Sequence, residues 1–413
     1  MIRRVLLSIL AAVALIAPAA AAPAVAAPPQ HRDDTGQLLQ QLLQAMHEAG
    51  MPGVLAQVRD GSQTWNLAAG VADVDTGRPV RPQFRHRVGS ITKTFVATTV
   101  LQLVGEDRVV LDAPIGRYLP DVLPGELGRQ VTVRMLLNHT SGIGDFTVVL
   151  FANPETVEEL RFRTFTPQEL IGIGLSQPPT NAPGERWSYS NTNYVILGLL
   201  IERLTGRPYA EEISRRILRP LGLQHTYFPG TNPYIRGPHM AGYVVLADGL
   251  RDVTVFNPSS GWAEGEMIST AADLNSFYRA LLTGRLLTPA LLAQMQTTVV
   301  VVPSLPEAAG YGLGIFWLAT PCGRVWGHFG EAVGYSTNSW HSADGRRQVT
   351  LAENLILYAA PGEIHPIDQA RDAFLSAALC GPQAPVFTSL RDEHLARVRI
   401  GAGLSAGATR APK

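Results

Sequence analysis

The stretch "VGSITKTF", residues 88–95, places Ser90 and Lys93 one helical turn apart. Side chains at positions i and i+3 of a helix share a face, so the amine can reach the hydroxyl. A serine hydroxyl is a weak nucleophile and needs a neighbouring base or cation to lose its proton. Gly89 permits a sharp turn before the helix, whose N-terminus favours negative charge. The same pair also fits a plain N-cap followed by a solvated lysine, so the rest of the chain must decide.

A second polar motif, "WSYSNTNY" at 187–194, stands just before the apolar helical pattern "VILGLLIERLTG". A tyrosine beside an ammonium group has its phenol pKa lowered, which would make Tyr189 a proton shuttle for Ser90. Asn191 could orient a substrate amide. The alternative interpretation is a hydrophobic staple and cap at the start of the helix.

A third motif, "VWGHFGEAVGY" at 325–335, places His328 between two glycines on an expected strand. Glycine weakens a strand and often marks the close approach of another backbone or a ligand. The backbone N–H of Glu331, just after Gly330, could pair with that of Ser90 as an oxyanion hole, where each donor is worth roughly 3 kcal/mol of barrier. An ordinary edge-strand histidine is the alternative.

The order S-x-x-K, Y-x-N, H-x-G resembles the serine penicillin-recognising enzymes: D-alanyl-D-alanine carboxypeptidases, class C β-lactamases and their serine esterase relatives. "LLNHTSGI" at 136–143 and "MISTAADLNSF" at 267–277 add to this resemblance, which extends from about residue 40 to 381. Most of all, the chain resembles secreted actinobacterial D-alanyl-D-alanine carboxypeptidases.

This resemblance implies an acyl-enzyme mechanism in which Ser90 is the nucleophile and Lys93 helps to activate it. It implies that Tyr189 is the general base in acylation and the acid to the leaving amine, and that Asn191 positions the acyl side chain. His328 would supply polarity beside the tyrosine, and the amides of Ser90 and Glu331 would hold the oxyanion. The implied substrates are peptides or small esters and amides, with β-lactams as further candidates, and no cofactor.

Two residues depart from the family pattern. Phe329 stands where a small hydroxyl residue is usual, and Glu331 follows Gly330. In the family those hydroxyls help to bind a substrate carboxylate. Arg324 is the one arginine near this motif, and we expect it to lie at the end of the strand away from the site, where it could not take over that role. The leading expectation is a D-alanyl-D-alanine carboxypeptidase acting on peptidoglycan-type peptides. An esterase or D-amino-acid peptidase or amidase comes next, then a β-lactamase, and a turnover-deficient penicillin-binding-like protein is the non-enzyme alternative.

The fold class that we predict is α+β: an antiparallel sheet flanked by helices, with an inserted, mostly helical domain. Strand patterns occur at 53–74, with a hairpin turn at Asp60-Gly61, and again at 311–358. We therefore expect a discontinuous sheet domain from 27–110 and 256–382, a helical domain at 111–255 and a C-terminal tail at 383–413. "APPQHRDDTGQ", residues 27–37, reads as a linker before a helix that ends at Gly50.

The N-terminus carries an export signal. Arg3 and Arg4 precede "VLLSILAAVALIA", and "AVA" at 24–26 fits a cleavage site, which predicts a signal peptide over 1–26 cut after Ala26. We expect a secreted monomer without membrane contact after cleavage. The formal net charge is zero, so the chain has no excess of positive charge that would indicate binding to nucleic acid.

Cysteine and histidine usage exclude other classes. Cys322 and Cys380 are the two cysteines, and in an oxidising compartment such a pair predicts one disulfide; the similar carboxypeptidases carry cysteines at matching places. The ten histidines show no metal-ligand spacing, so no metal is expected. "GLSAG" at 403–407 would suit an α/β-hydrolase, but it follows no core strand and no histidine comes after it.

Overall fold

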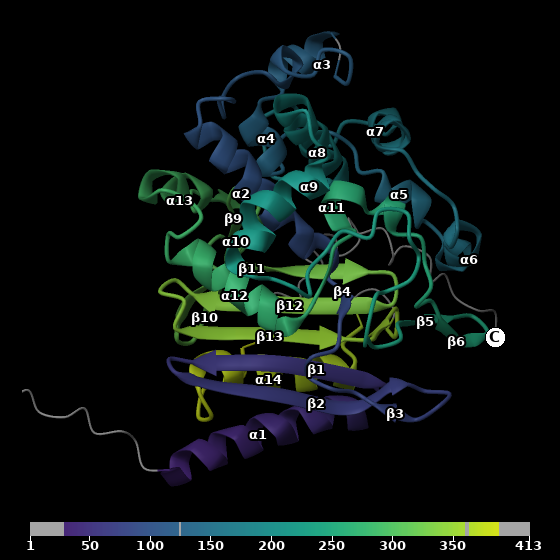
Figure 1. Ribbon diagram of the computed structural model, residues 1–413, viewed down its shortest axis with the longest axis vertical. Coiled ribbons are helices and arrows are strands. Elements are labelled where there is room, and N and C mark those ends of the chain that lie inside the picture. The colour runs from purple at the N-terminus through teal and green to yellow at the C-terminus, as the bar shows by residue number, and fades with distance from the viewer. Residues whose placement is uncertain (1–28, 124, 360–362, 388–413) are drawn as a thin grey trace, which may run out of the picture.

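The computed structural model describes residues 29–123, 125–359 and 363–387. The expected signal peptide at 1–26, and the expected tail from residue 388 onward, lie outside the described residues. Figure 1 shows a central sheet with most helices above it, α14 (Pro366–Cys380) behind its lower strands and α1 (Pro29–Glu48) below them. No described helix combines the length and apolar character needed to cross a membrane.

The main sheet of the described residues has nine strands in the order β3-β2-β1-β13-β12-β11-β10-β9-β8, each paired antiparallel to its neighbour. Early strands thus join late ones, which confirms the predicted fold class. The strands are β1 (Gly53–Asp60), β2 (Gln63–Asp73), β3 (Arg78–Pro79), β8 (Val299–Val300), β9 (Ala309–Tyr311), β10 (Phe316–Thr320), β11 (Gly323–Ala332), β12 (Tyr335–Ser342) and β13 (Arg347–Glu353).

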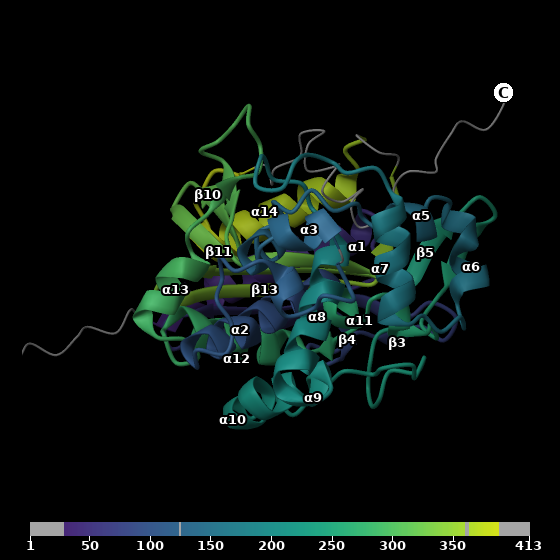
Figure 2. The same cartoon turned by 90° about the horizontal axis from the view of Figure 1, so that it is seen from above.

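Apolar side chains on both faces of the sheet explain why helices cover it. Leu39 and Leu43 of α1 and Phe374 of α14 are buried in one core with Val54 and Leu351 of the sheet. Burial of each such side chain is worth roughly 1.5–3 kcal/mol. On the opposite face lie α12 (Ala271–Leu282) and α2 (Thr92–Gly105), as the view from above in Figure 2 also shows.

The segment between residues 111 and 255 is mostly helical but also contains two strands that the sequence did not indicate. β5 (Tyr243–Leu246) and β6 (Gly249–Asp252) form a small sheet with β14 (Leu355–Ile356). A further pair joins β4 (His86–Arg87) to β7 (Ile268–Ser269). The helices are α3 (Gly125–Gln130), α4 (Val133–Leu137), α5 (Thr147–Leu150), α6 (Val157–Leu160), α7 (Pro167–Ser176), α8 (Asn191–Thr205), α9 (Tyr209–Ile213), α10 (Arg219–Leu221), α11 (Trp262–Gly265) and α13 (Pro289–Met295), with short turns η1 (Gly89–Ile91), η2 (Ile115–Arg117), η3 (Pro154–Thr156), η4 (Ser214–Leu218) and η5 (Pro258–Ser260).

The predicted linker at 27–37 is wrong, because α1 already begins at Pro29. Proline fits the first turn of a helix, where its missing N–H would have no partner. Gly36 lies inside the helix and against the Trp65 ring of β2: a β-carbon there would lie 2.9 Å from Cδ1. From Pro29 onward this stretch is therefore helix and not a linker.

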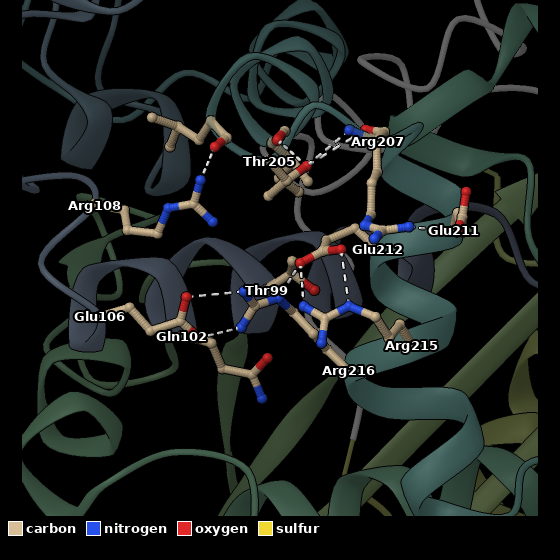
Figure 3. Close-up of polar contacts among 12 residues, drawn as sticks. Thr99, Gln102, Glu106, Arg108, Thr205, Arg207, Glu211, Glu212, Arg215 and Arg216 are labelled. Carbon is tan, nitrogen blue, oxygen red and sulfur yellow. Dashed lines mark hydrogen bonds and ion pairs between the residues drawn. The ribbon is translucent and has the colours of Figure 1, made fainter.

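A disulfide and a network of ion pairs connect elements at the periphery of the fold. The predicted disulfide between Cys322 and Cys380 is confirmed and joins the turn between β10 and β11 to the last residue of α14. In the helical layer, Arg216 bridges Glu106 and the buried Glu212, which also pairs with Arg215 (Figure 3). This network connects the end of α2 to α9 and η4.

Candidate active site

Ser90 lies in η1, directly before α2 and against β11. Its side chain is nearly buried, with 6% of the residue exposed. Gly89 has φ +52°, and a β-carbon there would lie 2.2 Å from the carbonyl oxygen of Glu331. Only glycine fits both the backbone angle and this close approach, so the turn that presents Ser90 depends on Gly89.

Lys93 is fully buried and has three acceptors around its amine. Its Nζ lies 2.8 Å from Ser90 Oγ, 2.9 Å from the backbone oxygen of Glu264 and 2.6 Å from Glu264 Oε2. The alternative of a plain cap and a solvated lysine is therefore wrong. Burial lowers the pKa of Lys93, which Glu264 partly offsets; burial likewise raises the pKa of Glu264, and Lys93 opposes that.

Tyr189 is buried beside this pair, and Lys93 Nζ lies 5.2 Å from the centre of its ring. The predicted lowering of its pKa is wrong: burial raises the pKa of Tyr189 well above its ordinary value, although the Ser90 hydroxyl opposes the rise. The physical reason is that burial disfavours the charged phenolate, and the nearby Glu264 and Asp145 disfavour it further. Within the described part of the chain, the Tyr189 hydroxyl makes no hydrogen bond of ordinary geometry.

Asn191 begins α8 and is held by an acid that the sequence did not single out. Its Nδ2 donates to Asp145 Oδ2 at 2.9 Å and to Thr147 Oγ1 at 3.2 Å. Asp145 is buried, and burial raises the pKa of its carboxyl to about 7. These bonds fix the amide of Asn191 at the edge of the cleft.

His328 is fully buried, and burial lowers its pKa to about 3, so the ring is neutral. Its Nε2 lies 3.2 Å from the Tyr311 hydroxyl. The ring that lies against Tyr189 is that of His139, with centroids 4.2 Å apart. The role expected of His328, polarity directly beside Tyr189, thus falls to His139, while His328 supports Tyr311.

The N-terminal and C-terminal halves of β11 have different neighbours. Its pairing with β10 ends where Phe316 faces Gly327, so from His328 onward this edge faces η1. A β-carbon on Gly330 would lie 2.0 Å from the Val88 carbonyl oxygen and 3.0 Å from the Ser90 nitrogen. The fold therefore brings the backbones of Ser90 and Glu331 together; their action as an oxyanion hole stays a prediction.

A cleft of about 570 Å³, open mouth included, lies beside Ser90. Carboxylates dominate its charged lining: Glu264, Glu266 and Glu331, of which Glu266 has its pKa raised to about 7 by burial. Apolar and small residues complete the wall, chiefly Phe151, Phe256, Pro258, Gly261, Gly265, Ala332 and Val333. Glu331 thus belongs to the wall of the cleft, together with the next two residues of the chain.

Arg87 also lines this cleft, and one nitrogen of its guanidinium is engaged by the protein backbone, whereas its Nε and Nη1 make no hydrogen bond among the described residues. Arg87 Nη2 donates to three carbonyl oxygens, those of Pro233, Thr254 and Phe256, at 2.9–3.2 Å. Phe329 is absent from the cleft wall and packs on Phe316, with ring centroids 5.3 Å apart. Phe329 therefore does not supply the missing hydroxyl of the third motif.

A second, wider groove of about 1570 Å³, open solvent included, is lined in part by Tyr189. Its walls come from the loop before α8 and from the segment around β8: Thr140, Gly184, Glu185, Arg186, Trp187, Ser188, Val299, Val300, Val301, Pro303 and Pro306. Tyr189 contributes to this groove but not to the wall of the cleft beside Ser90.

The structure gathers Ser90, Lys93, Tyr189 and Asn191 as the sequence order implied, and adds three residues that it did not. Glu264 sits among small residues in "GWAEGEM", and Asp145 follows the "LLNHTSGI" motif that contains His139. Two glutamates among small and apolar residues were the signal in the sequence that could have pointed to Glu264.

Comparison with known proteins adds a family to this geometry. Residues 37–355 match the family model named Beta-lactamase. An esterase, EstB of Burkholderia gladioli, is 34% identical over 198 residues, which are 46% of this chain and 50% of the esterase. A D-aminopeptidase of Brucella anthropi is 30% identical over 73% of this chain and 55% of its own length. The chain thus spans about half the length of these two curated relatives.

Solved structures match over a larger share. A D-stereospecific amidohydrolase from a Streptomyces species has a TM-score of 0.75 and 40% identity, covering 84% of this chain and 99% of its own. The D-amino acid amidase of Ochrobactrum anthropi SV3 reaches a TM-score of 0.72 with 27% identity over 83% of this chain and 98% of its own. The matched motifs, the buried serine–lysine pair and these similarities place the chain in the beta-lactamase family, as a serine hydrolase with the fold of β-lactamases and penicillin-binding proteins.

Proposed function

We propose that the protein is a secreted serine amidohydrolase that cleaves amides or short peptides of D-amino acids bearing a free amino group. The observation that carries this proposal is the cleft beside Ser90, whose lining carboxylates are Glu264, Glu266 and Glu331. Such a cleft suits an ammonium group and disfavours the C-terminal carboxylate of a D-alanyl-D-alanine peptide.

Two cations beside the cleft have partners within the protein. Lys93 is paired with Glu264, and Arg87 donates to backbone carbonyls. Glu331 is the acid on the strand edge next to Ser90, which makes it the residue that we assign to the substrate amine. A carboxylate that binds the substrate amine also helps to orient the reacting carbonyl group of the substrate toward Ser90.

The comparisons support this choice over the carboxypeptidase that the sequence resemblance favoured first. Relatives named as a D-aminopeptidase, a D-amino acid amidase and a D-stereospecific amidohydrolase all act, by their names, on D-configured substrates. The similarity to an esterase adds ester cleavage as a second candidate activity, since an uncharged ester needs no carboxylate anchor.

Three substrates test the proposal at pH 7, where an α-amine is mostly protonated. They are D-phenylalaninamide, its N-acetyl derivative and an N-acylated D-alanyl-D-alanine peptide. We expect kcat/KM for the free amine to exceed the other two by at least tenfold, and Ser90→Ala to abolish all turnover. Faster release of D-alanine from the acylated peptide would overturn the proposal in favour of a carboxypeptidase.

A matched variant isolates the amine contact. Glu331→Gln keeps the backbone N–H and the side-chain length but removes the charge. We expect KM for D-phenylalaninamide to rise at least tenfold, with little change for a neutral p-nitrophenyl ester. An equal effect on both substrates would place the role of Glu331 in the fold of β11 and not in amine binding.

A further inference from the structure

We infer that Glu264 is the proton acceptor of Lys93, so that a serine–lysine–glutamate relay, not the serine–lysine pair alone, activates the nucleophile. Glu264 acts through Lys93 and is therefore a positioning and relay residue. The inference rests on Ser90 being the nucleophile of the proposed function.

The geometry of the amine requires such an acceptor. A protonated lysine has three N–H donors, and Lys93 Nζ has three acceptors: Ser90 Oγ, the Glu264 backbone oxygen and Glu264 Oε2. An ammonium group in this arrangement has no lone pair with which to accept the serine proton. Of its three partners, only the Glu264 carboxylate can take a proton from it.

Burial acts in the same direction on both partners. It lowers the pKa of Lys93 and raises that of Glu264, which eases proton transfer from the amine to the carboxylate, while the contact between the two partners opposes both shifts. The Lys93 side chain is 0% exposed and that of Glu264 is 11% exposed, toward the cleft.

Other groups near the pair are poorer bases for Ser90. The pKa of Tyr189 is raised well above its ordinary value by burial, so a phenolate is disfavoured. Burial keeps His139 and His328 neutral, and neither donates to nor accepts from Lys93 among the described contacts. The titratable groups whose charge interacts with Glu264 are Lys93, Asp145, Tyr189 and Tyr209.

Every proton that moves during acylation is given and received by Ser90, Lys93, Glu264, Tyr189 or the substrate. Lys93 gives a proton to Glu264; Ser90 Oγ then bonds to the substrate carbonyl carbon while its own proton passes to the Lys93 amine. The oxyanion reforms the carbonyl, the bond to the leaving amine breaks, and that amine receives a proton from Lys93, directly or through Tyr189. Water repeats the sequence on the acyl-enzyme, and Glu264 returns the first proton to Lys93.

The decisive experiment measures acylation alone, as the burst of p-nitrophenol from a neutral p-nitrophenyl ester, across pH 5 to 9. For Glu264→Gln we expect the acylation rate to fall by about 10²–10⁴-fold, with a changed pH profile. For Glu264→Asp we expect a smaller loss. For Glu264→Ala we expect partial recovery in sodium formate, because formate can enter the cleft and replace the lost carboxylate.

Controls separate this relay from general stability and from the proposed function. Glu353→Gln breaks another buried ion pair, with Arg371 at 2.9 Å and away from the cleft; it should lower the melting temperature but keep the pH profile. An unchanged acylation rate and pH profile in Glu264→Gln would overturn the relay. Loss of activity in Glu264→Ala without any formate rescue, together with a wild-type profile in Glu264→Asp, would also overturn it. No burst in the wild type, or a burst retained in Ser90→Ala, would instead refute the proposed function.

Discussion

Gly330 and Val88 lie so close that a β-carbon on Gly330 would be 2.0 Å from the Val88 carbonyl oxygen. At this contact the backbone of the C-terminal half of β11 packs directly against the turn that carries Ser90. It explains why the third motif needs glycine at this position, independently of any ligand. The same approach sets the spacing between the amides of Ser90 and Glu331.

Gly330→Ala should therefore damage catalysis by opening that spacing. Removal of one oxyanion donor costs about 10²–10³ in kcat, and we expect a loss of this order with KM little changed. Gly172→Ala in α7 is the matched control, because a β-carbon there meets nothing within 4 Å. Wild-type kcat in Gly330→Ala would show that the two amides do not act together.

Covalent labelling tests the nucleophile directly. Incubation of the wild type with a β-lactam, followed by intact mass measurement, should give an adduct of one β-lactam, and Ser90→Ala should give none. The reason is that Ser90 is the hydroxyl bonded to the buried Lys93. An adduct that survives in Ser90→Ala would place the reactive group elsewhere.

The sequence was sufficient for the fold and for residues whose motifs are local. S-x-x-K, Y-x-N and H-x-G each name positions within a few residues, and the strand alternation at 53–74 and 311–358 predicted the sheet. The order of these motifs then implied which of them would meet.

The sequence could not give contacts that only the tertiary structure creates. Glu264 is 171 positions from Lys93, and neither local sequence indicates that the two side chains meet. The same holds for Asp145 and Asn191, 46 positions apart. The prediction that the Tyr189 pKa is lowered was wrong for a related reason. The sequence indicated the ammonium group of Lys93, but it indicated neither the partner carboxylate of Glu264 nor the burial of Tyr189.

His341 should make the stability of the protein fall in mild acid. It is fully buried, burial lowers its pKa to about 3, and its Nε2 lies 3.0 Å from Ser339 Oγ. Below pH 6.5 the unfolded state binds a proton there that the folded state does not, so the free energy of unfolding decreases as the pH falls toward 3. Between pH 7 and 5 this linkage amounts to about 2 kcal/mol.

His341→Gln provides the measurement for that prediction. Urea unfolding at pH 7 and pH 5 should show the variant less stable than the wild type at pH 7, with the difference reduced by about 2 kcal/mol at pH 5. A difference that stays constant between the two pH values would mean that His341 becomes protonated in the folded state.

Glu212 should contribute far more to stability than its neighbour Glu211, although both pair with arginines in Figure 3. The Glu212 side chain is 1% exposed, and its bonds to Arg215 and Arg216 lower its pKa to about 2. That stabilisation is present above pH 4.5 and is lost as the pH falls toward 2. Glu211 pairs with Arg207 at 3.1 Å, but both side chains are about half exposed.

Urea unfolding of the two glutamine variants compares these pairs under one substitution. Glu212→Gln should lower the free energy of unfolding at pH 7 by roughly 2–4 kcal/mol, because it leaves a buried arginine, Arg216, without one of its two carboxylates. Glu211→Gln should change it by less than about 1 kcal/mol, since exposed pairs are screened by water. The gap between the Glu212 variant and the wild type should narrow below pH 4.5. Equal, small effects of both substitutions would show that Arg216 keeps its position through Glu106 alone.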